Sequence, residues 1–297
     1  MSDLLNRRAN PRRRLRELLS GGQLVPAPGV YDAMSARLVE AAGFPAVYMS
    51  GFGVTASLLG RPDIGLLGMS EMAQAARRIV AAVDVPVIAD ADTGYGNAIN
   101  VIRTVQEYEA AGVAALHIED QVTPKRCGHM TGKQVVPAEV MIDKVKAAVS
   151  ARQDPDLVLI ARTDAAAVEG IDAAIDRALR YREAGADMLF LDALSSQEDI
   201  EKAATALAAE QVLFSWGEGG LTPPTTLDQL RGWGFSVVIF PVAALLASVS
   251  ATRSLLAQIT GDGTPIRAME GLPNLKEFFG LIGLDEVDEL GRRFSHG

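Results

Sequence analysis

The run Glu109-Ala-Ala-Gly112-Val-Ala-Ala-Leu-His-Ile-Glu119 has the features of a helix end, a glycine and then a short apolar strand. Glycine suits the left-handed backbone conformation just past a helix. An apolar run without alternation suits a strand that is buried on both faces, as in a parallel sheet. The same pattern recurs at residues 40–50, 183–192 and 231–240. These repeats predict an α/β protein with a parallel sheet.

Further apolar runs predict strands between these units, and alanine-rich amphipathic runs predict helices that pack on a sheet. The additional strands are expected at Leu24–Ala27, Val85–Asp90, Leu157–Arg162 and Val212–Ser215, and helices at Asn97–Ala111, Pro137–Ala151, Ile171–Ala184 and Gln197–Ala209. Eight βα units in roughly 240 residues predict a (β/α)₈ TIM-type barrel rather than two Rossmann halves. The dinucleotide-binding fingerprint is also missing, because Gly51-Phe-Gly53 lacks its third glycine.

No break in composition divides the 297 residues, so we expect one barrel domain over residues 1–297. It would carry an N-terminal helical extension at about residues 1–20 and a C-terminal helical tail at about residues 260–297, whose apolar stretch packs on the barrel or on a neighbouring subunit. The arginine-rich start is open to interpretation as a transit peptide or a nucleic-acid arm. We favour an amphipathic helix with a solvated polar face, because leucines follow at helical spacing and the net charge of -9 repels nucleic acid.

The composition is 48% hydrophobic and 22% charged, which is typical of globular proteins. No run approaches the length of about 18 apolar residues that a membrane span needs, so no membrane partner is expected. The single cysteine, Cys127, excludes an intrachain disulfide and fits the reducing cytoplasm, where we expect the protein.

Cys127 lies in the run Pro124-Lys125-Arg126-Cys127-Gly128-His129. The thiolate is the reactive form of cysteine, and nearby positive charge lowers the pKa of a thiol. The run therefore favours a reactive thiol, although many single cysteines are only small hydrophobic residues. It belongs to the long segment Gln121–Val136, and a loop of this length in a compact barrel is typical of a mobile lid. Three cations in that lid, Lys133 being the third, indicate an anionic substrate.

Carboxylates collect where two neighbouring predicted strands end, which is where (β/α)₈ barrels perform chemistry. Asp90-Ala-Asp92 ends one strand and His117-Ile-Glu119-Asp120 ends the next. Buried carboxylates need cations, and carboxylate oxygens are the ligands that Mg²⁺ prefers. We therefore predict a Mg²⁺ site, with Mn²⁺ as an alternative ion, at Asp90, Asp92 and Glu119 and with Asp120 as a further candidate. Strand-end caps and surface carboxylates are the alternative interpretation.

Other polar residues at strand ends predict a substrate site. The candidate substrate-binding residues are Ser50, Gly51, Phe52, Gly128, His129, Arg162, Asp192, Ser215 and Glu218. Arg162 offers a planar fork for a carboxylate. His117 points to the same strand face as Glu119, so it either orients a neighbour or takes part directly. No Cys-x-x-Cys pair is present to suggest zinc.

Five motifs in one collinear order resemble the isocitrate lyase/phosphoenolpyruvate mutase superfamily. They are Tyr48-Met-Ser-Gly51, Asp90-Ala-Asp-Thr-Gly-Tyr-Gly96, His117-Ile-Glu-Asp-Gln121, Lys125-Arg-Cys-Gly-His129 and Ala161-Arg-Thr-Asp-Ala165. The chain is most similar to the methylisocitrate lyase and 2,3-dimethylmalate lyase branch, which includes the plant petal-death-type lyases. The mutase branch carries an Asn-containing loop where this chain has Lys-Arg-Cys-Gly-His.

The resemblance implies a barrel whose last helix swaps between subunits of a homotetramer, a dimer of dimers. The resemblance implies that Asp90, Asp92 and Glu119, with Asp63 nearby, hold Mg²⁺ largely through water. It also implies that Ser50, Gly51 and Arg162 hold the 2-oxo-acid part of the ligand and that Cys127 is the acid–base residue. His129, as a donor to a substrate carboxylate, and Tyr48, as a candidate for the base, are further catalytic candidates from the residues themselves. The implied activity is that of an oxo-acid lyase. It would cleave the C2–C3 bond of a small anionic 2-hydroxy dicarboxylate to a 2-oxo acid, pyruvate or glyoxylate, and a carboxylate, through an enediolate that Cys127 protonates.

Three positions depart from the methylisocitrate lyases, which have Glu in place of Asp192, Asn in place of Ser215 and Arg near Leu246. The missing carboxylate donors predict a substituted malate as substrate rather than a tricarboxylate. Oxaloacetate hydrolysis or decarboxylation on the same site is the alternative activity, and phosphonopyruvate chemistry is a third. A non-catalytic 2-oxo-acid-binding protein is the alternative from another class.

Overall fold

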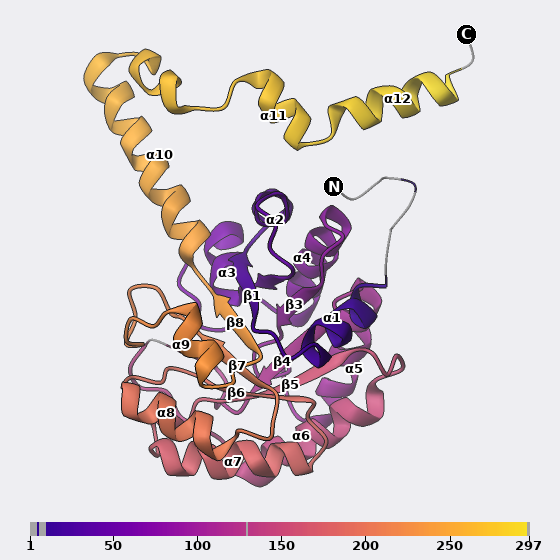
Figure 1. The fold of residues 1–297 in the computed structure, drawn as a ribbon, viewed down its shortest axis with the longest axis vertical. Coiled ribbons are helices and arrows are strands. Elements are labelled where there is room, and N and C mark those ends of the chain that lie inside the picture. The colour runs from indigo at the N-terminus through magenta and orange to yellow at the C-terminus, as the bar shows by residue number, and fades with distance from the viewer. Residues whose placement is uncertain (1–4, 6–9, 129, 296–297) are drawn as a thin grey trace.

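The computed structural model describes residues 5, 10–128 and 130–295, and its centre is a closed barrel of eight parallel strands. The strands pair in chain order, and the first pairs with the last to close the barrel. They are β1 Val25–Val30, β2 Val47–Met49, β3 Val87–Asp90, β4 Ala115–Glu119, β5 Val158–Thr163, β6 Met188–Leu191, β7 Val212–Ser215 and β8 Val237–Phe240. The predicted (β/α)₈ TIM-type barrel is confirmed (Figure 1).

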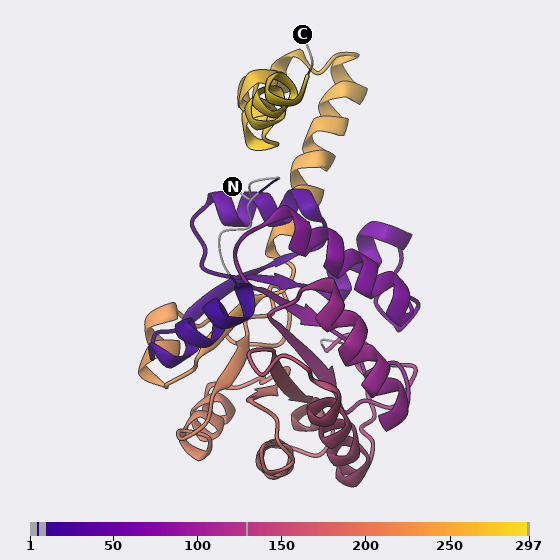
Figure 2. The ribbon, with the colours of Figure 1, turned by 90° about the vertical axis from the view of Figure 1, so that its right-hand side faces the viewer.

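Helices alternate with the strands, and those between β1 and β8 surround the barrel, whereas α1 lies at one end of it and α10 to α12 follow β8 (Figure 2). They are α1 Pro11–Ser20, α2 Ala33–Ala41, α3 Gly51–Leu59, α4 Met69–Ala82, α5 Ala98–Ala111, α6 Ala138–Ala151, α7 Ile171–Glu183, α8 Gln197–Ala206, α9 Leu227–Gly232, α10 Ala243–Asp262, α11 Leu275–Leu281 and α12 Leu284–Phe294. The predicted helices agree with α5, α6, α7 and α8 apart from residues at their ends. Gly112 ends α5 with φ 90°, the left-handed conformation that its pattern predicted.

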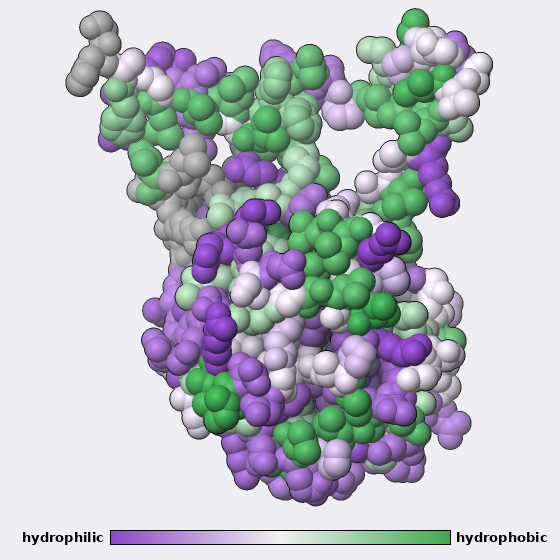
Figure 3. Space-filling model, turned by 180° about the vertical axis from the view of Figure 1, so that it is seen from behind, coloured by the Kyte–Doolittle hydropathy of each residue, from purple (hydrophilic) through white to green (hydrophobic). Residues whose placement is uncertain are grey.

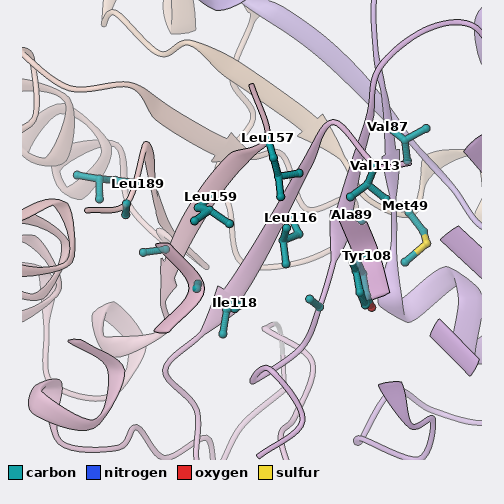
Figure 4. Packing of buried hydrophobic residues seen from close by; sticks show 14 of the residues in the cluster. Met49, Val87, Ala89, Tyr108, Val113, Leu116, Ile118, Leu157, Leu159 and Leu189 are labelled. Atoms are coloured by element: carbon teal, nitrogen blue, oxygen red, sulfur yellow. The ribbon is translucent and has the colours of Figure 1, made fainter. Parts of the chain in front are cut away.

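Alternation along each strand divides the core into two layers. On β4, Leu116 and Ile118 belong to the outer cluster (Figure 4) and lie against α6. Ala115 belongs instead to the cluster inside the barrel. His117 and Glu119 share the inward direction of Ala115, because successive strand side chains point to opposite faces. The interior is therefore apolar near the amino ends of the strands and polar at the mouth formed by their carboxyl ends.

Helix α1 closes the amino end of the barrel. Leu15 and Leu19 are buried together with the interior side chains of the strands. Arg12 pairs with Asp154 at 2.8 Å, and Arg16 donates to three backbone carbonyls just before β5. The expectation of a solvated polar face on this helix is therefore wrong for these two arginines, which satisfy backbone and carboxylate oxygens under the barrel.

Helices α10, α11 and α12 form an arm that leaves the barrel (Figures 1 and 3). None of their residues is buried, and apolar side chains along the arm face solvent, with Leu275 71% exposed. The tail was expected to begin at about residue 260, but the departure begins earlier, with α10 at Ala243. After its first turns, α10 presents apolar residues to solvent rather than to the strands.

No helix in the described part of the chain has the length and apolar character that a membrane span requires.

If α1 is part of the barrel core, Leu15→Ala will lower the free energy of unfolding by about 2–5 kcal/mol, because Leu15 is 1% exposed and its removal leaves a cavity. Thermal unfolding should then begin on the order of 10 °C lower. Arg13→Ala, on the exposed face of the same helix, is the control and should change little. Equal effects of the two substitutions would show that α1 is a dispensable extension.

Candidate active site

The polar mouth of the barrel contains a cavity of about 200 Å³. The predicted site residues that line it are Tyr48, Ser50, Phe52, Asp63, Asp90, Cys127, Gly128, Arg162, Asp192, Ser215 and Glu218. Gly51, Asp92 and Glu119 lie behind its walls, and His129 lies outside the described residues. The tertiary structure thus brings predicted residues from six of the eight strand ends and the loops that follow them to one site.

Asp90 is held in place at the end of β3 by two backbone donors. Gly51 N donates to its Oδ2 at 3.2 Å and Asp92 N to its Oδ1 at 2.9 Å. A Cβ atom on residue 51 would lie 2.5 Å from Asp90 Oδ2, so a side chain there would displace the carboxylate. Gly51 therefore positions Asp90 and does not line the cavity. Ser50 caps α3 by accepting from Gly53 N at 3.1 Å.

Tyr48 and His117 form a buried pair inside the barrel. The Tyr48 hydroxyl lies 2.9 Å from His117 Nε2. Burial lowers the pKa of His117 to about 4, so the imidazole is neutral at neutral pH. Burial also raises the pKa of Tyr48 well above its usual value, with the charge of Asp90 adding to the effect. A phenol that holds its proton so firmly is poorly suited to the role of base that the sequence suggested for Tyr48.

Four carboxylates, those of Asp63, Asp90, Asp92 and Glu119, are buried around the end of β3 and β4. Lys125 compensates part of this charge, because its Nζ lies 2.5 Å from Asp63 Oδ2 and 2.7 Å from Asp92 Oδ1. Burial raises the pKa of Asp92 to about 6 despite Lys125. Asp92 also has a φ of 46°, a strained conformation of the kind that occurs at functional sites.

These carboxylates fit a divalent cation that is bound through water. Asp92 Oδ1 and Glu119 Oε1 are buried and accept no hydrogen bond from described residues. Within residues 5, 10–128 and 130–295, no group of three His, Cys, Asp or Glu side chains is placed to hold a metal ion. Mg²⁺ keeps several of its waters in proteins, so oxygens that lie apart can still share one hydrated ion.

Arg162 is surrounded by carboxylates. It donates from Nε and Nη2 to Asp164 at 3.0 and 3.1 Å and from Nη2 to Asp192 at 2.7 Å, and Glu119 Oε2 lies 3.3 Å from Nε. Burial alone would raise the pKa of Asp164, but Arg162 and Lys133 bring it well below its usual value. These hydrogen bonds fix the orientation of the guanidinium. A fixed orientation suits a group that would receive a substrate carboxylate.

The segment that carries Cys127 lies against this arginine network. Cys127 N donates to Asp63 O at 3.2 Å, and Lys133 Nζ donates to Gly128 O at 2.6 Å and to Asp164 at 2.9 Å. A Cβ atom on Gly128 would lie 1.8 Å from Asp192 Oδ2, so only glycine allows this approach. Lys125 and Lys133 were expected to be cations of a lid over the site. Both are buried in ion pairs that anchor the segment, and Lys125 also lines the cavity.

Two further predicted residues have structural roles. Asp120, a candidate metal ligand in the sequence, accepts hydrogen bonds from Thr163 Oγ1 at 2.7 Å and the Tyr181 hydroxyl at 2.8 Å. Glu218 lines the cavity and also accepts from the first backbone amides of α10 at 3.0 and 3.1 Å. The sequence did not predict the ion pair between Asp164 and Lys133 beside the site. The signal for Asp164 in the sequence was the Ala161–Ala165 motif.

One end of the cavity is apolar. Its walls there are Phe52, Ile239, Pro241, Val242 and Leu246, and the neutral polar residues of the whole lining include Ser50 and Ser215. Leu246, the position at which the sequence motifs suggested that an arginine is missing, is one of these lining residues. The charged groups are concentrated on the β3–β6 side.

Comparison with known proteins is consistent with this geometry. The phosphoenolpyruvate phosphomutase family matches residues 15–260 of the chain. The 2,3-dimethylmalate lyase of Eubacterium barkeri is 44% identical over 97% of this chain and 99% of its own. The 2-methylisocitrate lyase of Aeropyrum pernix is 46% identical over 93% of this chain and 88% of its own.

A similar solved structure is that of an oxaloacetate acetylhydrolase in complex with the inhibitor 3,3-difluorooxalacetate. It superposes with a TM-score of 0.91 and 36% identity, over 99% of this chain and 98% of that one. The family match covers the whole barrel and the relatives cover nearly the whole chain. The resemblance inferred from the five motifs is thus confirmed, and the chain belongs to the phosphoenolpyruvate phosphomutase/isocitrate lyase superfamily.

Proposed function

We propose that the protein is a Mg²⁺-dependent carbon–carbon lyase that cleaves a substituted malate to a 2-oxo acid and a carboxylate. The observation that carries the proposal is the position of Cys127. It lines the same small cavity as Arg162, Asp90 and Lys125, so a thiol faces the place where an anionic ligand would be held.

The charges of the cavity support the need for a divalent cation. Four carboxylates line it, those of Asp63, Asp90, Asp192 and Glu218, against the cations Lys125, Arg126 and Arg162. A dicarboxylate substrate adds more negative charge, which a buried site tolerates only with added positive charge. Asp63, Asp90, Asp92 and Glu119 would hold the cation through water. When bound, it supplies positive charge that stabilises the C1 carboxylate and the developing charge on the C2 oxygen.

Cys127 would act as the proton donor. When the C2–C3 bond breaks, the C2 hydroxyl gives its proton to a base of the site, C2 becomes the carbonyl carbon of the 2-oxo acid, and the bonding electrons stay on C3 as part of an enediolate. The Cys127 thiol then gives its proton to C3, which forms the carboxylate product. Arg162 would orient the substrate, and the segment from Lys125 to Lys133 would keep water away from the enediolate.

The apolar end of the cavity supports a small substrate. Val242 and Leu246 offer no donor to a third carboxylate, whereas alkyl groups on C2 or C3 would bury apolar surface there. Oxaloacetate hydrolysis is the second candidate function. One similar solved structure is that of an oxaloacetate acetylhydrolase, and oxaloacetate is, like a malate, a small dicarboxylate.

The exposed arm supports the proposal that α10 to α12 pack on another subunit of a homotetramer. The arm leaves a row of apolar side chains in water, including Phe278 and Phe279, which a second copy would cover. We propose the cytoplasm as the compartment, because a single cysteine without an intrachain disulfide fits a reducing environment.

Cys127→Ser should reduce kcat by about 10²–10⁴, because a serine hydroxyl is a far weaker acid than a thiol and proton donation is lost. Pyruvate should still bind in the presence of Mg²⁺, as measured by calorimetry. Met130→Ser, an exposed position on the same segment, is the control. Full activity of Cys127→Ser on malate derivatives would exclude Cys127 as the donor, and no turnover by the unaltered enzyme would favour the non-catalytic binding protein.

A substrate panel should show cleavage of 2,3-dimethylmalate and related malates with a higher kcat/KM than that of methylisocitrate. Release of pyruvate, glyoxylate and oxalate would be followed with Mg²⁺ present, and oxaloacetate is included to test the second candidate. Leu246→Arg should move the preference toward the tricarboxylate, because it adds a carboxylate donor at the apolar end. Faster cleavage of methylisocitrate by the unaltered enzyme would contradict the proposed substrate class.

Phe278→Glu together with Phe279→Glu should dissociate the assembly, because charges would be buried against the partner. Sedimentation velocity measures the change, and Lys276→Glu on the same helix is the control. A monomer in the unaltered protein would argue against the tetramer.

A further inference from the structure

A second cavity lies beside the substrate cavity and is larger, with a volume of about 800 Å³ against about 200 Å³. Its walls are the segment before α4, the β3–α5 loop, the segment between β4 and α6, and the first two turns of α5 and α6. Lys125 lines both cavities, and the other residues around the second cavity do not line the first. The chemistry proposed for the substrate cavity makes no use of this space.

The walls of the second cavity carry an excess of positive charge. They contain three cations, Arg103, Lys125 and Lys144, against one carboxylate, that of Asp92. Lys125 already compensates Asp92, because its Nζ lies 2.7 Å from Asp92 Oδ1. Arg103 lies at the exposed rim, where its Nε is 4.0 Å from Glu107 Oε1, and an exposed pair of this length is weak. The excess is local, since the chain has a net charge of -9, and it favours an anionic occupant.

Lys144 is a buried cation without a carboxylate partner among the described residues. It is 4% exposed, and its Nζ donates a hydrogen bond to Thr93 O at 2.7 Å. Burial lowers the pKa of Lys144, and the charges of Glu119 and Asp120 oppose this effect from a distance. The other buried lysine and arginine side chains of the described residues all form ion pairs with carboxylates; they are Lys125, Lys133, Arg162 and Arg177. An anion in the cavity would supply the charge that Lys144 lacks.

Neutral donors lie along the same walls. The hydroxyls of Thr93 and Thr123 are 3.2 Å apart, and one proton lies between their oxygens, so the other proton remains for a ligand. Asn97 and Asn100 use their Oδ1 atoms to accept from backbone amides at the start of α5, which fixes the orientation of both side chains. Their side-chain N–H groups donate to none of the described residues, so both remain available to an occupant of the cavity.

A phosphate group fits this set of donors better than a carboxylate does. A phosphate monoester carries a charge of about −1.5 to −2 near neutral pH and has three strong acceptor oxygens. That charge matches the two cations of the walls that no buried carboxylate pairs with, Arg103 and Lys144. Arginine also binds phosphate oxygens in a bidentate manner. The cavity is larger than a phosphate group needs, so it leaves room for an organic part.

An occupant of this cavity would also contact the segment that carries Cys127. Gln121 and Thr123 of that segment line the cavity, and Thr93 lies on the wall formed by the β3–α5 loop. Gln121 Nε2 donates to Arg126 O, and Arg126 N donates to Gln121 Oε1, both at 2.9 Å. The cavity wall is thus tied to the residue that precedes the thiol. An anion bound between Thr93 and Thr123 would hold the segment against the loop.

We propose that the second cavity binds the phosphate group of a small organic molecule through Lys144 and Arg103, and that its occupant restrains the segment that carries Cys127. The inference goes beyond the lyase activity proposed above and does not require it, because the ligand-binding cations belong to the second cavity alone. The occupant would be an effector rather than a substrate, since Cys127 lines the other cavity.

Binding is tested on the full-length protein with inorganic phosphate, followed by the broadening of its phosphorus NMR signal. The dissociation constant should be on the order of 1 mM, and Lys144→Met should raise it about tenfold or more, because the buried charge is removed. Arg103→Gln should raise it about threefold, and this exposed position tests the site even where Lys144→Met fails to fold. Lys146→Met, on the exposed face of α6, is the matched control and should stay within about twofold.

Leu246→Glu distinguishes the two cavities. It adds negative charge to the substrate cavity, so phosphate binding should stay within about twofold if the ion lies in the second cavity. Loss of binding in this variant, equal affinity of the Lys144→Met and Lys146→Met proteins, or no binding by the unaltered protein would overturn the site. Acetate should bind about tenfold more weakly than phosphate, and equal binding of the two would overturn the phosphate class.

The restraint on the segment is measured by alkylation of Cys127 with iodoacetamide, a neutral reagent that reports on the one thiol of the chain. Saturating phosphate should slow alkylation of the unaltered protein about threefold or more, and should have no effect on the Lys144→Met protein. Phosphate that binds without changing the rate would overturn the restraint. Neither measurement follows turnover, so an absence of lyase activity would overturn the proposed function and leave this site standing.

Discussion

The structure of the barrel mouth depends on the compensation of buried carboxylates. Asp63, Asp90, Asp92, Glu119 and Asp164 are all buried, and an isolated buried charge costs several kcal/mol. Three cations compensate the charge of these carboxylates, namely Lys125, Lys133 and Arg162. Each of them contacts more than one acceptor. The arrangement leaves oxygens of Asp92 and Glu119 without hydrogen-bond donors among the described residues. That remaining deficit is what supports the proposal of a divalent cation at the site.

The same ion pairs position the segment that carries Cys127. Lys125 and Lys133 stand at the two ends of the stretch that contains Cys127, and both are tied to strand-end carboxylates. Gly128 fits against Asp192 because it has no Cβ atom. Charge compensation and the position of the thiol are therefore one structural problem. A substitution at either lysine would disturb the stability of the mouth and the chemistry proposed for Cys127 together.

Much of the fold was predictable, because the signals that specify a (β/α)₈ barrel are local. Gly112 after α5 and the unbroken apolar run of β4 are properties of neighbouring residues, and their repetition implied the barrel. Candidate site residues were predictable for the same reason, since strand-end residues must converge at the mouth. Departures arose where partners are distant in sequence. Arg12 and Asp154, for example, are 142 residues apart. Their ion pair holds α1 against the end of the barrel, although the sequence predicted that the polar face of this helix is solvated.

The sequence by itself determined which elements form and which chemical groups lie at the strand ends, because backbone periodicity and side-chain direction are set by adjacent residues. Only the tertiary structure decided what those groups do. In the folded chain, Lys125 forms ion pairs with Asp63 and Asp92. Asp120 accepts hydrogen bonds from Thr163 and Tyr181. Tyr48 is buried beside His117, and burial raises the pKa of Tyr48. The physical reason is that ion pairing and desolvation depend on distances across the barrel, and those distances are fixed only when all eight strands have closed.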